Sequence, residues 1–254
     1  MKKICIYIPA RNVEKTLGSV IDRIPNRMKR EVKEILIIDN CSKDGTYRIA
    51  KEYKKRLKKL TIIRNKRDIN YGGSQKKAYN YVIKKGYDIV VMLHGDGQYP
   101  PEKIPQMIKP ILLNKVDMTL GSRIKGDPLK GGMPLWRFSG NRILTFFENI
   151  VLGLNLSEFH SGFRAYNCHS LYKVPFLLCS DDYNFDSDII VQFKIKGLKI
   201  IDIEIPTYYG EESKSPTTKE TFIYSMNIVI TLYRYLLCKY NLKKIKKFSF
   251  KETP

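Results

Sequence analysis

The chain has 254 residues, of which 43% are hydrophobic, and it carries 46 Lys and Arg against 25 Asp and Glu. This length and apolar fraction suit one large domain, or one domain with an appendage, around a sizeable core. The net charge of +21 implies an anionic partner: nucleic acid, an anionic membrane face or a phosphorylated substrate. A compositional bias towards lysine is the alternative explanation for the scattered part of this charge.

The cysteines and the N-terminus both suggest a cytosolic protein. The five cysteines are scattered, never form CxxC, and lie at Cys5, Cys41, Cys168, Cys179 and Cys238. We expect reduced thiols, without a disulfide framework and without metal ligation by cysteine. The apolar run after the basic start MKK is short and ends at Pro9, so we expect a first β-strand there rather than a signal peptide.

Strands and helices alternate through the first half of the chain. Short apolar runs rich in β-branched residues predict five strands, at 3–8, 34–40, 60–65, 88–93 and 116–123. Helical patterns fall between the first four, at 13–24, 42–57 and 72–86, and the segment 100–114 precedes the fifth. This alternation predicts an α/β fold with a mostly parallel, doubly wound central sheet and helices on both faces.

The second half of the chain is less regular. The segment 139–156 is apolar on much of its circumference, 161–167 resembles a turn leading into a strand, and 183–197 begins with acids and continues as a helix. A further strand is predicted within 199–210. The segment 221–251 is apolar at first and then strongly basic.

Polar residues follow each predicted strand of the first half. They are Pro9-Ala10-Arg11-Asn12, Asp39-Asn40, Arg64-Asn65, His94-Gly95-Asp96 and Gly121-Ser122-Arg123. Ligands of open α/β sheets bind beyond the carboxyl ends of the strands. We therefore expect these groups to converge on one site.

Asp96 and Gln98 form the sharpest feature, on a glycine-rich turn directly after a buried strand. A carboxylate and an amide offer hard oxygen ligands, so this turn predicts a site for Mg²⁺ or Mn²⁺ that would neutralise a diphosphate leaving group. An ordinary Asp-Gly turn is the alternative. His94 is taken as structural unless a ligand set forms around it.

Other candidate site residues have ordinary structural alternatives. Asp39 could bind a base or ribose, or cap the following helix. Arg123 could clamp phosphate or be a surface arginine, and Arg164 could contact phosphate or pair with a carboxylate. Asp186 and Asp188 open a helix, where acids are favoured, and one of them could act as a general base or orient an acceptor.

The C-terminal segment Phe222–Cys238 is mostly apolar but falls short of the roughly 20 apolar residues of a spanning helix. Five lysines follow, at Lys239, Lys243, Lys244, Lys246 and Lys247. An apolar helix with a polybasic flank suits a helix lying in an anionic membrane interface, with residues 135–156 as its companion. Two core or dimer helices with a solvated tail are the alternative.

Taken together, the motifs resemble the family-2 glycosyltransferases of the type A fold, especially the branch with dolichyl-phosphate mannose synthase and bacterial polyprenyl-phosphate glycosyltransferases. The resemblance covers roughly residues 3–209. It is carried by IPARN (8–12), IIDNCSKDGT (37–46), YGGSQKKAY (71–79), HGDGQYPPE (94–102), GSR (121–123), SGFRAY (161–166), FDSDI (185–189) and IPTYYGEES (205–213). Each motif is weak alone, whereas eight in this order are specific.

The resemblance implies a role for each matching residue. The nucleotide pocket would be lined by Pro9, Ala10, Asn12 and Gly73, and Asp39 would contact the base. Asp96, helped by Gln98, would hold a metal ion on the diphosphate. Arg123 and Arg164 would face phosphate or the acceptor, and Asp188 would be the acidic residue near the acceptor. Reaction would invert the anomeric centre in one in-line displacement.

Two positions depart from the family pattern. The usual DxD motif is His94-Gly95-Asp96 here, which leaves one carboxylate for the metal. If His94 is itself a ligand, the site would favour Mn²⁺ over Mg²⁺. Val13 stands where an acid is common, with Glu14 one position later.

We therefore expect a metal-dependent inverting glycosyltransferase that moves a hexose from a UDP- or GDP-linked donor to a membrane acceptor, most simply a polyprenyl phosphate. Residues 1–212 would form the catalytic domain, including a candidate interfacial helix at 135–156. Residues 213–254 would form the C-terminal apolar helix and polybasic tail. The protein would lie at the cytoplasmic face of a membrane, bind no nucleic acid, and could form a homo-oligomer.

Several rival functions remain open at this point. The acceptor could be a saccharide or a protein, or the chain could be a nucleotide-sugar-binding or membrane-scaffold protein with little turnover. A nucleic-acid binder ranks last, because no zinc-finger spacing and no aromatic-basic RNA motif occurs. A nucleotidyltransferase is disfavoured, because no glycine follows the first strand before Gly18.

Overall fold

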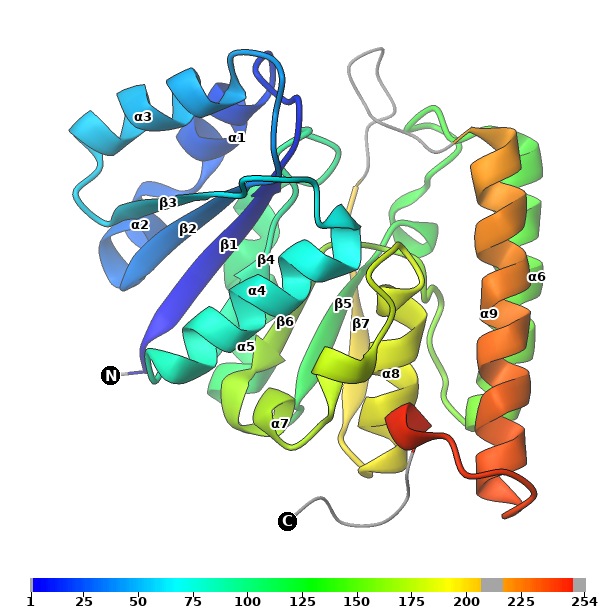
Figure 1. The fold of residues 1–254 in the computed structure, drawn as a ribbon. Helices are drawn as coiled ribbons and strands as arrows, with labels where there is room; N and C mark the ends of the chain where they lie inside the picture. Colours follow the sequence, from blue (N-terminus) through cyan, green and yellow to red (C-terminus); the bar gives the residue numbers. More distant parts are fainter. Residues whose placement is uncertain (1, 207–216, 249–254) are drawn as a thin grey trace.

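The computed structural model describes residues 2–206 and 217–248, and within them seven strands form one sheet (Figure 1). The strands are β1 Ile4–Ala10, β2 Glu34–Asp39, β3 Leu60–Arg64, β4 Ile89–Met92, β5 Met118–Ser122, β6 Arg164–Asn167 and β7 Ile200–Glu204. Their order in the sheet is β3-β2-β1-β4-β6-β5-β7. Only β6 runs antiparallel, between β4 and β5. The mostly parallel α/β fold is confirmed.

Helices cover both faces of this sheet. They are α1 Leu17–Arg23, α2 Asn26–Glu31, α3 Thr46–Arg56, α4 Asn70–Lys84, α5 Ile104–Leu112, α6 Leu135–Leu152, α7 Cys168–Tyr172, α8 Phe185–Ile195 and α9 Thr218–Lys239. The short helices α2 and α7 were not expected from the sequence. The expected domain boundary at 212/213 and residues 207–213 of the last motif lie outside the described residues.

Two hydrophobic cores form because successive side chains of a strand point to opposite faces. On β1, Cys5 and Tyr7 enter one core, whereas Ile4, Ile6 and Ile8 enter the other. The first core packs against α4, α7, α8 and α9, and the second against α1, α2, α3 and α5. Since both faces are covered, the strands read as continuous apolar runs, which is why they were recognisable in the sequence.

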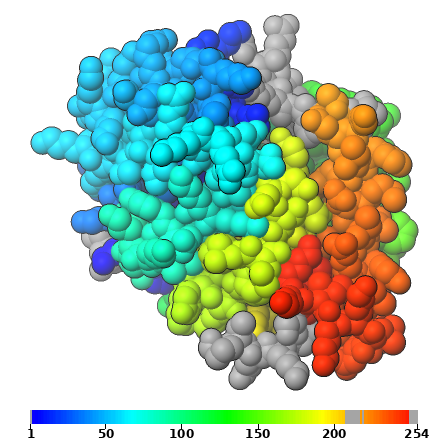
Figure 2. Space-filling model, in the orientation of Figure 1, coloured from blue at the N-terminus to red at the C-terminus, as the bar shows by residue number. Residues whose placement is uncertain are grey.

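Helices α6 and α9 lie side by side at one end of the sheet, outside the two layers (Figure 1). In the space-filling view, α9 and the C-terminal turn form one continuous edge of the molecule (Figure 2). Helix α9 is held against α8 by buried residues on one of its faces, including Ile228, Thr231 and Tyr235. The C-terminal apolar helix is therefore confirmed, and it belongs to the folded body.

A buried ion pair fastens the C-terminal turn to α8. The Nζ atom of Lys247 lies 2.8 Å from both carboxylate oxygens of Asp188, which is fully buried. The same carboxylate accepts hydrogen bonds from the Ser180 amide and the Thr231 hydroxyl. Asp188 therefore joins the start of α8, the middle of α9 and the chain after α9.

Helix α4 begins against the loop before α8, and glycine makes this contact possible. A Cβ atom on Gly72 would lie 2.4 Å from the Ser180 carbonyl oxygen and 2.9 Å from that of Asp182. The amides of Gly72 and Gly73 donate to the Asp181 carbonyl, at 2.7 and 3.2 Å. The paired glycines thus allow backbone to meet backbone beside the strand ends.

We predict that Asp188→Asn lowers the free energy of unfolding by about 3 kcal/mol, because it leaves the Lys247 charge part-buried without its partner. Lys246→Ala changes an exposed neighbour and serves as the control. Urea unfolding measures both. Equal stabilities of the two variants would contradict the structural role of Asp188.

We predict that Gly72→Ala lowers the free energy of unfolding by about 1–3 kcal/mol, because the added methyl group meets backbone that has no free space. Gly140→Ala is the matched control, since its Cβ would meet nothing within 4 Å in helix α6. That control should raise stability by about 0.5–1 kcal/mol. Thermal unfolding of both variants tests the pair, and a neutral Gly72→Ala would refute the close packing.

Candidate functional site

The candidate site lies at the carboxyl edge of the sheet around β1. This strand pairs with β2 on one side and β4 on the other, so the chain connections diverge at this point. Such switch points are where ligands of open α/β sheets bind. Asp39 ends β2, Asp96 follows β4, and Pro9 and Ala10 end β1 between them.

The turn that carries Asp96 depends on its two glycines. Gly95 packs against the end of β1, where an added Cβ would lie 3.2 Å from the Pro9 carbonyl oxygen, and Gly97 has φ of +78°. The Thr16 hydroxyl holds the turn by donating to the Gly95 carbonyl at 2.7 Å. Asp96 is half-buried, and its Oδ1 accepts from the Gln98 amide at 3.2 Å. The contact is made by the Gln98 backbone N–H within the turn, and the proposed metal-binding role of the Gln98 side chain stays a prediction.

Asn12 organises the corner between β1 and β2. It adopts a left-handed backbone conformation with φ of 50°, which asparagine tolerates better than most residues. Its amide donates to the Ser42 hydroxyl at 3.0 Å, and its side chain accepts from the Lys43 amide at 2.8 Å. Asn12 thereby fixes the loops that follow both strands beside Asp39.

Asp39 is fully buried at the end of β2. Its Oδ1 accepts from the Ser42 amide at 3.0 Å, and its Oδ2 lies 3.1 Å from Nε of Arg64. That second contact lacks hydrogen-bond alignment, so Oδ2 is a buried acceptor without an aligned donor among the described residues. Such an acceptor is costly unless it meets a donor, which a bound base or ribose can supply.

His94 is enclosed by aromatic side chains and by Gly162. Its ring contacts Tyr71 and Tyr99 edge-on, and its Nε2 lies 3.3 Å from the Tyr71 hydroxyl. A Cβ atom at Gly162 would lie 2.4 Å from the same nitrogen, so only glycine fits beside the His94 ring at this position. Burial lowers the pKa of His94, with the Asp96 carboxylate as the largest opposing influence.

Below His94 lies a buried charged network centred on Asp186. Its carboxylate accepts from the Tyr71 hydroxyl at 2.9 Å and from Gln75 at 3.1 Å, and it lies 3.3 Å from Arg164. Arg164 is itself fully buried. Its guanidinium also donates to the backbone carbonyls of Phe159, Ser161 and Asp186, at 2.8–2.9 Å. This is the structural pairing left open above, and it presents no exposed surface to a phosphate.

Arg123 follows β5 and is held by buried Glu158. The Arg123 amide and Nε each lie 2.6 Å from a Glu158 oxygen, and the terminal guanidinium also contacts this carboxylate. Burial alone would raise the pKa of Glu158, but Arg123 and Asn141 together keep it below its ordinary value. The Arg123 side chain is only 12% exposed, so a phosphate would have to compete with Glu158 for it.

Of the remaining expected residues, Gly73 and Asp188 are used in packing, whereas Asp186 contacts the site. Gly73 lies in the first turn of α4, where its amide is used by Asp181. Asp188 does not lie at the site. Both its carboxylate oxygens bind Lys247, between α8 and the turn after α9. Asp186, two residues earlier, is the acid that reaches the His94 network. The helical spacing of the two acids alone could not distinguish them, since only their tertiary partners differ.

Three residues of this neighbourhood were missed by sequence reasoning: Tyr71, Tyr183 and Glu158. The rings of Tyr71 and Tyr183 lie 5.0 Å apart, and Tyr183 is 54% exposed. An exposed tyrosine at a site edge is a common ligand contact. The YGG motif was a usable signal for Tyr71, whereas the other two carried none.

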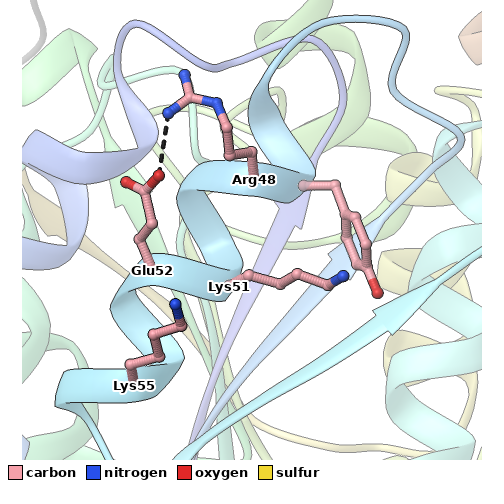
Figure 3. A pocket seen from close by; sticks show the side chains of 5 residues that line it. Arg48, Lys51, Glu52 and Lys55 are labelled. Atoms are coloured by element: carbon pink, nitrogen blue, oxygen red, sulfur yellow. Dashed lines mark hydrogen bonds and ion pairs between the residues drawn. The ribbon is translucent and has the colours of Figure 1, made fainter.

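A shallow pocket elsewhere lies on the outer face of α3 (Figure 3). It is lined by Tyr47, Arg48, Lys51, Glu52 and Lys55. Its one carboxylate is paired, with Arg48 and Glu52 3.0 Å apart. This pocket offers neither strand ends nor unpaired acceptors, so we place the functional site at β1 instead.

No group of three or more His, Cys, Asp or Glu able to hold a metal ion occurs in residues 2–206 and 217–248. A metal ion that binds together with a nucleotide needs less, because one or two carboxylates suffice when phosphate oxygens complete the coordination. The half-buried Asp96, one of whose oxygens accepts the Gln98 amide, fits that arrangement.

Comparison with known proteins agrees with this architecture. The chain is 29% identical over 250 residues to the UDP-N-acetylglucosamine–dolichyl-phosphate N-acetylglucosaminyltransferase of Methanococcus voltae, covering 94% of this chain and 96% of the relative. It is 26% identical to the undecaprenyl-phosphate mannosyltransferase of Micrococcus luteus, covering 78% and 79%.

Among solved structures, glucosyl-3-phosphoglycerate synthase of Mycobacterium tuberculosis with Mn²⁺, UDP and its product has a TM-score of 0.70 at 18% identity. The match covers 92% of this chain and 79% of that one, which shows a shared fold. The model of glycosyl transferase family 2 matches residues 5–174, two thirds of the chain. The chain therefore belongs to glycosyl transferase family 2 and is a glycosyltransferase.

Proposed function

We propose that this glycosyltransferase moves a hexose from a UDP- or GDP-linked donor to a polyprenyl phosphate at the cytoplasmic face of a membrane, with inversion. The observation that carries the proposal is the placement of buried Asp39 and half-buried Asp96 on either side of the end of β1. One acid can receive a base or ribose, and the other lies at the far side of the same switch point, where a diphosphate would extend.

Donor binding follows from these two acids. Asp39 offers Oδ2 as a buried acceptor, and Asn12 shapes the adjoining loop. Asp96, with Gln98 beside it, would hold Mg²⁺ or Mn²⁺ on the diphosphate. When bound, the cation would offset the negative charge that builds up on the leaving nucleoside diphosphate. The Nε2 atom of His94 lies 3.3 Å from the Tyr71 hydroxyl, so His94 joins that ligand set only if it gives up this contact.

The transfer needs no general base if the acceptor is a phosphate. An acceptor phosphate oxygen, already anionic, forms the new bond to the anomeric carbon. The bond from that carbon to the β-phosphate oxygen breaks, and the nucleoside diphosphate leaves with the electron pair. We assign Asp186, rather than Asp188, as the acid on the acceptor side, where it orients Tyr71 and His94 instead of taking a proton.

Acceptor delivery from a membrane is supported by the outer faces of α6 and α9. Both present large apolar side chains to solvent: Leu135, Trp136, Ile143, Phe146, Phe147 and Ile150 on α6, and Phe222, Ile223, Met226, Val229, Ile230 and Tyr233 on α9. A soluble protein rarely exposes so large a contiguous apolar patch without a partner. Lysines 239, 243, 244 and 246 continue it and are exposed, whereas Lys247 is bound to Asp188.

This apolar surface suits a helix pair lying in the interface better than one crossing the bilayer. Lys219–Lys239 is long and apolar enough to span, with mean hydropathy of 1.2. However, its opposite face is packed on α8, where Thr231 bonds with Asn184 at 3.0 Å. A helix with one face in lipid and the other on protein, flanked by lysines, is typical of peripheral attachment to anionic lipid.

We predict that UDP or GDP binds wild-type protein more tightly with Mn²⁺ than with EDTA, and that Asp96→Asn removes this difference with a loss of at least about tenfold. Asp39→Asn should weaken binding with and without metal, because its contact is to the nucleoside. Asp127→Asn, at an exposed loop position, is the control. Isothermal titration calorimetry measures all four proteins. Absence of nucleotide binding under every condition would refute the proposal.

We predict that the protein floats with vesicles containing anionic phospholipid and that the double variant Phe146→Ser, Phe222→Ser does not. Burial of each phenylalanine ring in lipid contributes about 2 kcal/mol, so removal of each ring lowers the partition coefficient onto vesicles by more than about tenfold. Leu177→Ser is the control, because Leu177 is 57% exposed but lies outside both helices. Flotation of the double variant at wild-type levels would favour a soluble saccharide or protein acceptor.

A further inference from the structure

Helix α6 has the reverse of an ordinary amphipathic pattern. Its buried face carries Asn141, Thr145 and Glu148, at the spacing of one helical stripe, whereas the outer face is apolar. Burying polar groups is costly unless each finds a partner. The polar stripe must therefore be occupied with specific contacts, and these contacts lead to a single segment of chain.

That segment is residues 156–160, which we call the bridge segment. Its even-numbered residues bind α6. The side-chain amide of Asn149 donates to the Leu156 carbonyl at 2.7 Å and accepts from its amide at 2.9 Å. Asn141 donates to Glu158 at 2.9 Å. The Oε2 atom of Glu148 lies 3.1 Å from Nε2 of His160, a close contact that lacks hydrogen-bond alignment. The three partners on α6 all lie within residues 141–149.

The odd-numbered residues of the bridge segment bind the sheet. The Ser157 amide donates to Asp202 on β7 at 2.7 Å, and its hydroxyl lies 2.6 Å from that of Ser122 on β5. Phe159 is in the core, and its carbonyl accepts from Arg164. The bridge segment is thus fixed alternately to the outer helix and to β5, β6 and β7.

The bridge segment also holds the acceptor side of the site. Glu158 grips Arg123 through both its backbone amide and its guanidinium, and the His160 carbonyl accepts from the same guanidinium at 3.3 Å. From the other helix, the Tyr224 hydroxyl lies 3.4 Å from Nδ1 of His160. His160 therefore lies between Glu148 of α6 and Tyr224 of α9, at the point where both lipid-facing helices meet the site.

We propose that Glu148 is a positioning residue that couples the seating of α6 and α9 on lipid to the placement of Arg123. The Glu148 and His160 side chains are 2% and 8% exposed, so lipid does not touch them. Movement of α6 on lipid shifts His160 and the bridge segment, and with them Glu158 and its hold on Arg123. The inference rests on the proposed lipid-phosphate acceptor.

The kinetic test compares Glu148→Leu with Phe147→Ser, its outward-facing neighbour on α6. Each is assayed with a long-chain polyprenyl phosphate in vesicles and with a short-chain isoprenyl phosphate dissolved in buffer. For Glu148→Leu we expect unchanged flotation and donor KM, but a kcat at least tenfold lower with both acceptors. For Phe147→Ser we expect a lower rate of transfer with the acceptor in vesicles and an unchanged rate with the soluble acceptor. Glu148→Gln should recover most of the kcat, because glutamine keeps the length and polarity of the side chain that contacts His160.

A second readout does not depend on catalysis. Hydrogen exchange of amides 156–160 should slow when anionic vesicles are added to the wild type, and it should be faster and insensitive to vesicles in Glu148→Leu. Wild-type kcat in Glu148→Leu with both acceptors, or exchange that ignores vesicles in the wild type, would overturn the coupling. If Glu148→Leu does not fold, Tyr224→Phe must lower kcat with unchanged donor KM, or the proposal fails.

A wrong acceptor class and a wrong coupling give different experimental results. If the wild type transfers sugar to neither phosphate acceptor, the proposed acceptor class is wrong, and hydrogen exchange still decides whether α6 controls the bridge segment. If transfer occurs and only the exchange and kcat predictions fail, the function stands and the coupling is wrong.

Discussion

The buried pair of Arg164 and Asp186 is the constraint on which the site depends. A fully buried guanidinium must satisfy all its donors, and here they go to three backbone carbonyls and one carboxylate. These bonds fix the 159–161 backbone and the start of α8 together. Because Asp186 then binds the Tyr71 hydroxyl, α4 is fixed as well, and the place of His94 follows.

This constraint explains why the antiparallel strand β6 lies inside an otherwise parallel sheet. Arg164 is its first residue and pairs in register with Met92 of β4, directly before the turn that carries Asp96. The strand therefore enters the sheet at its site edge and delivers the guanidinium below the turn. A parallel strand at this position would end, rather than begin, at that edge.

Much of the fold could be predicted, because its physical causes are local. Strands buried on both faces are continuous apolar runs, and glycines mark the turns after them. Asp39, Asp96 and Asn12 could be singled out for the same reason, since each stands at or just after the end of a strand. The ion-pair partner of a charged residue could not be predicted in this way, because the partner is distant in the chain. Nothing near Arg123 in the chain indicates Glu158, and nothing near Asp188 indicates Lys247, so neither buried ion pair could be expected from the sequence.

The sequence of helix α6 contains a signal of its orientation that the sequence-based predictions did not use. The segment was described as apolar around much of its circumference, whereas its polar residues recur at 141, 145 and 148, on one face. In a water-soluble helix that face would point outward. Here it points inward, and only the reversal of the pattern distinguishes a helix with an exposed apolar face from an ordinary amphipathic helix.

The apolar outer face of α6 and α9 has a further consequence for the large positive charge, which opposes self-association of the protein through this face. Without lipid, two copies of this chain gain by bringing these faces together, and repulsion between molecules of net charge +21 opposes that contact. Repulsion acts over a Debye length of about 8 Å at 0.15 M salt and about 3 Å at 1 M. Ionic strength, rather than fold stability, therefore sets how well the protein stays dispersed in solution without lipid.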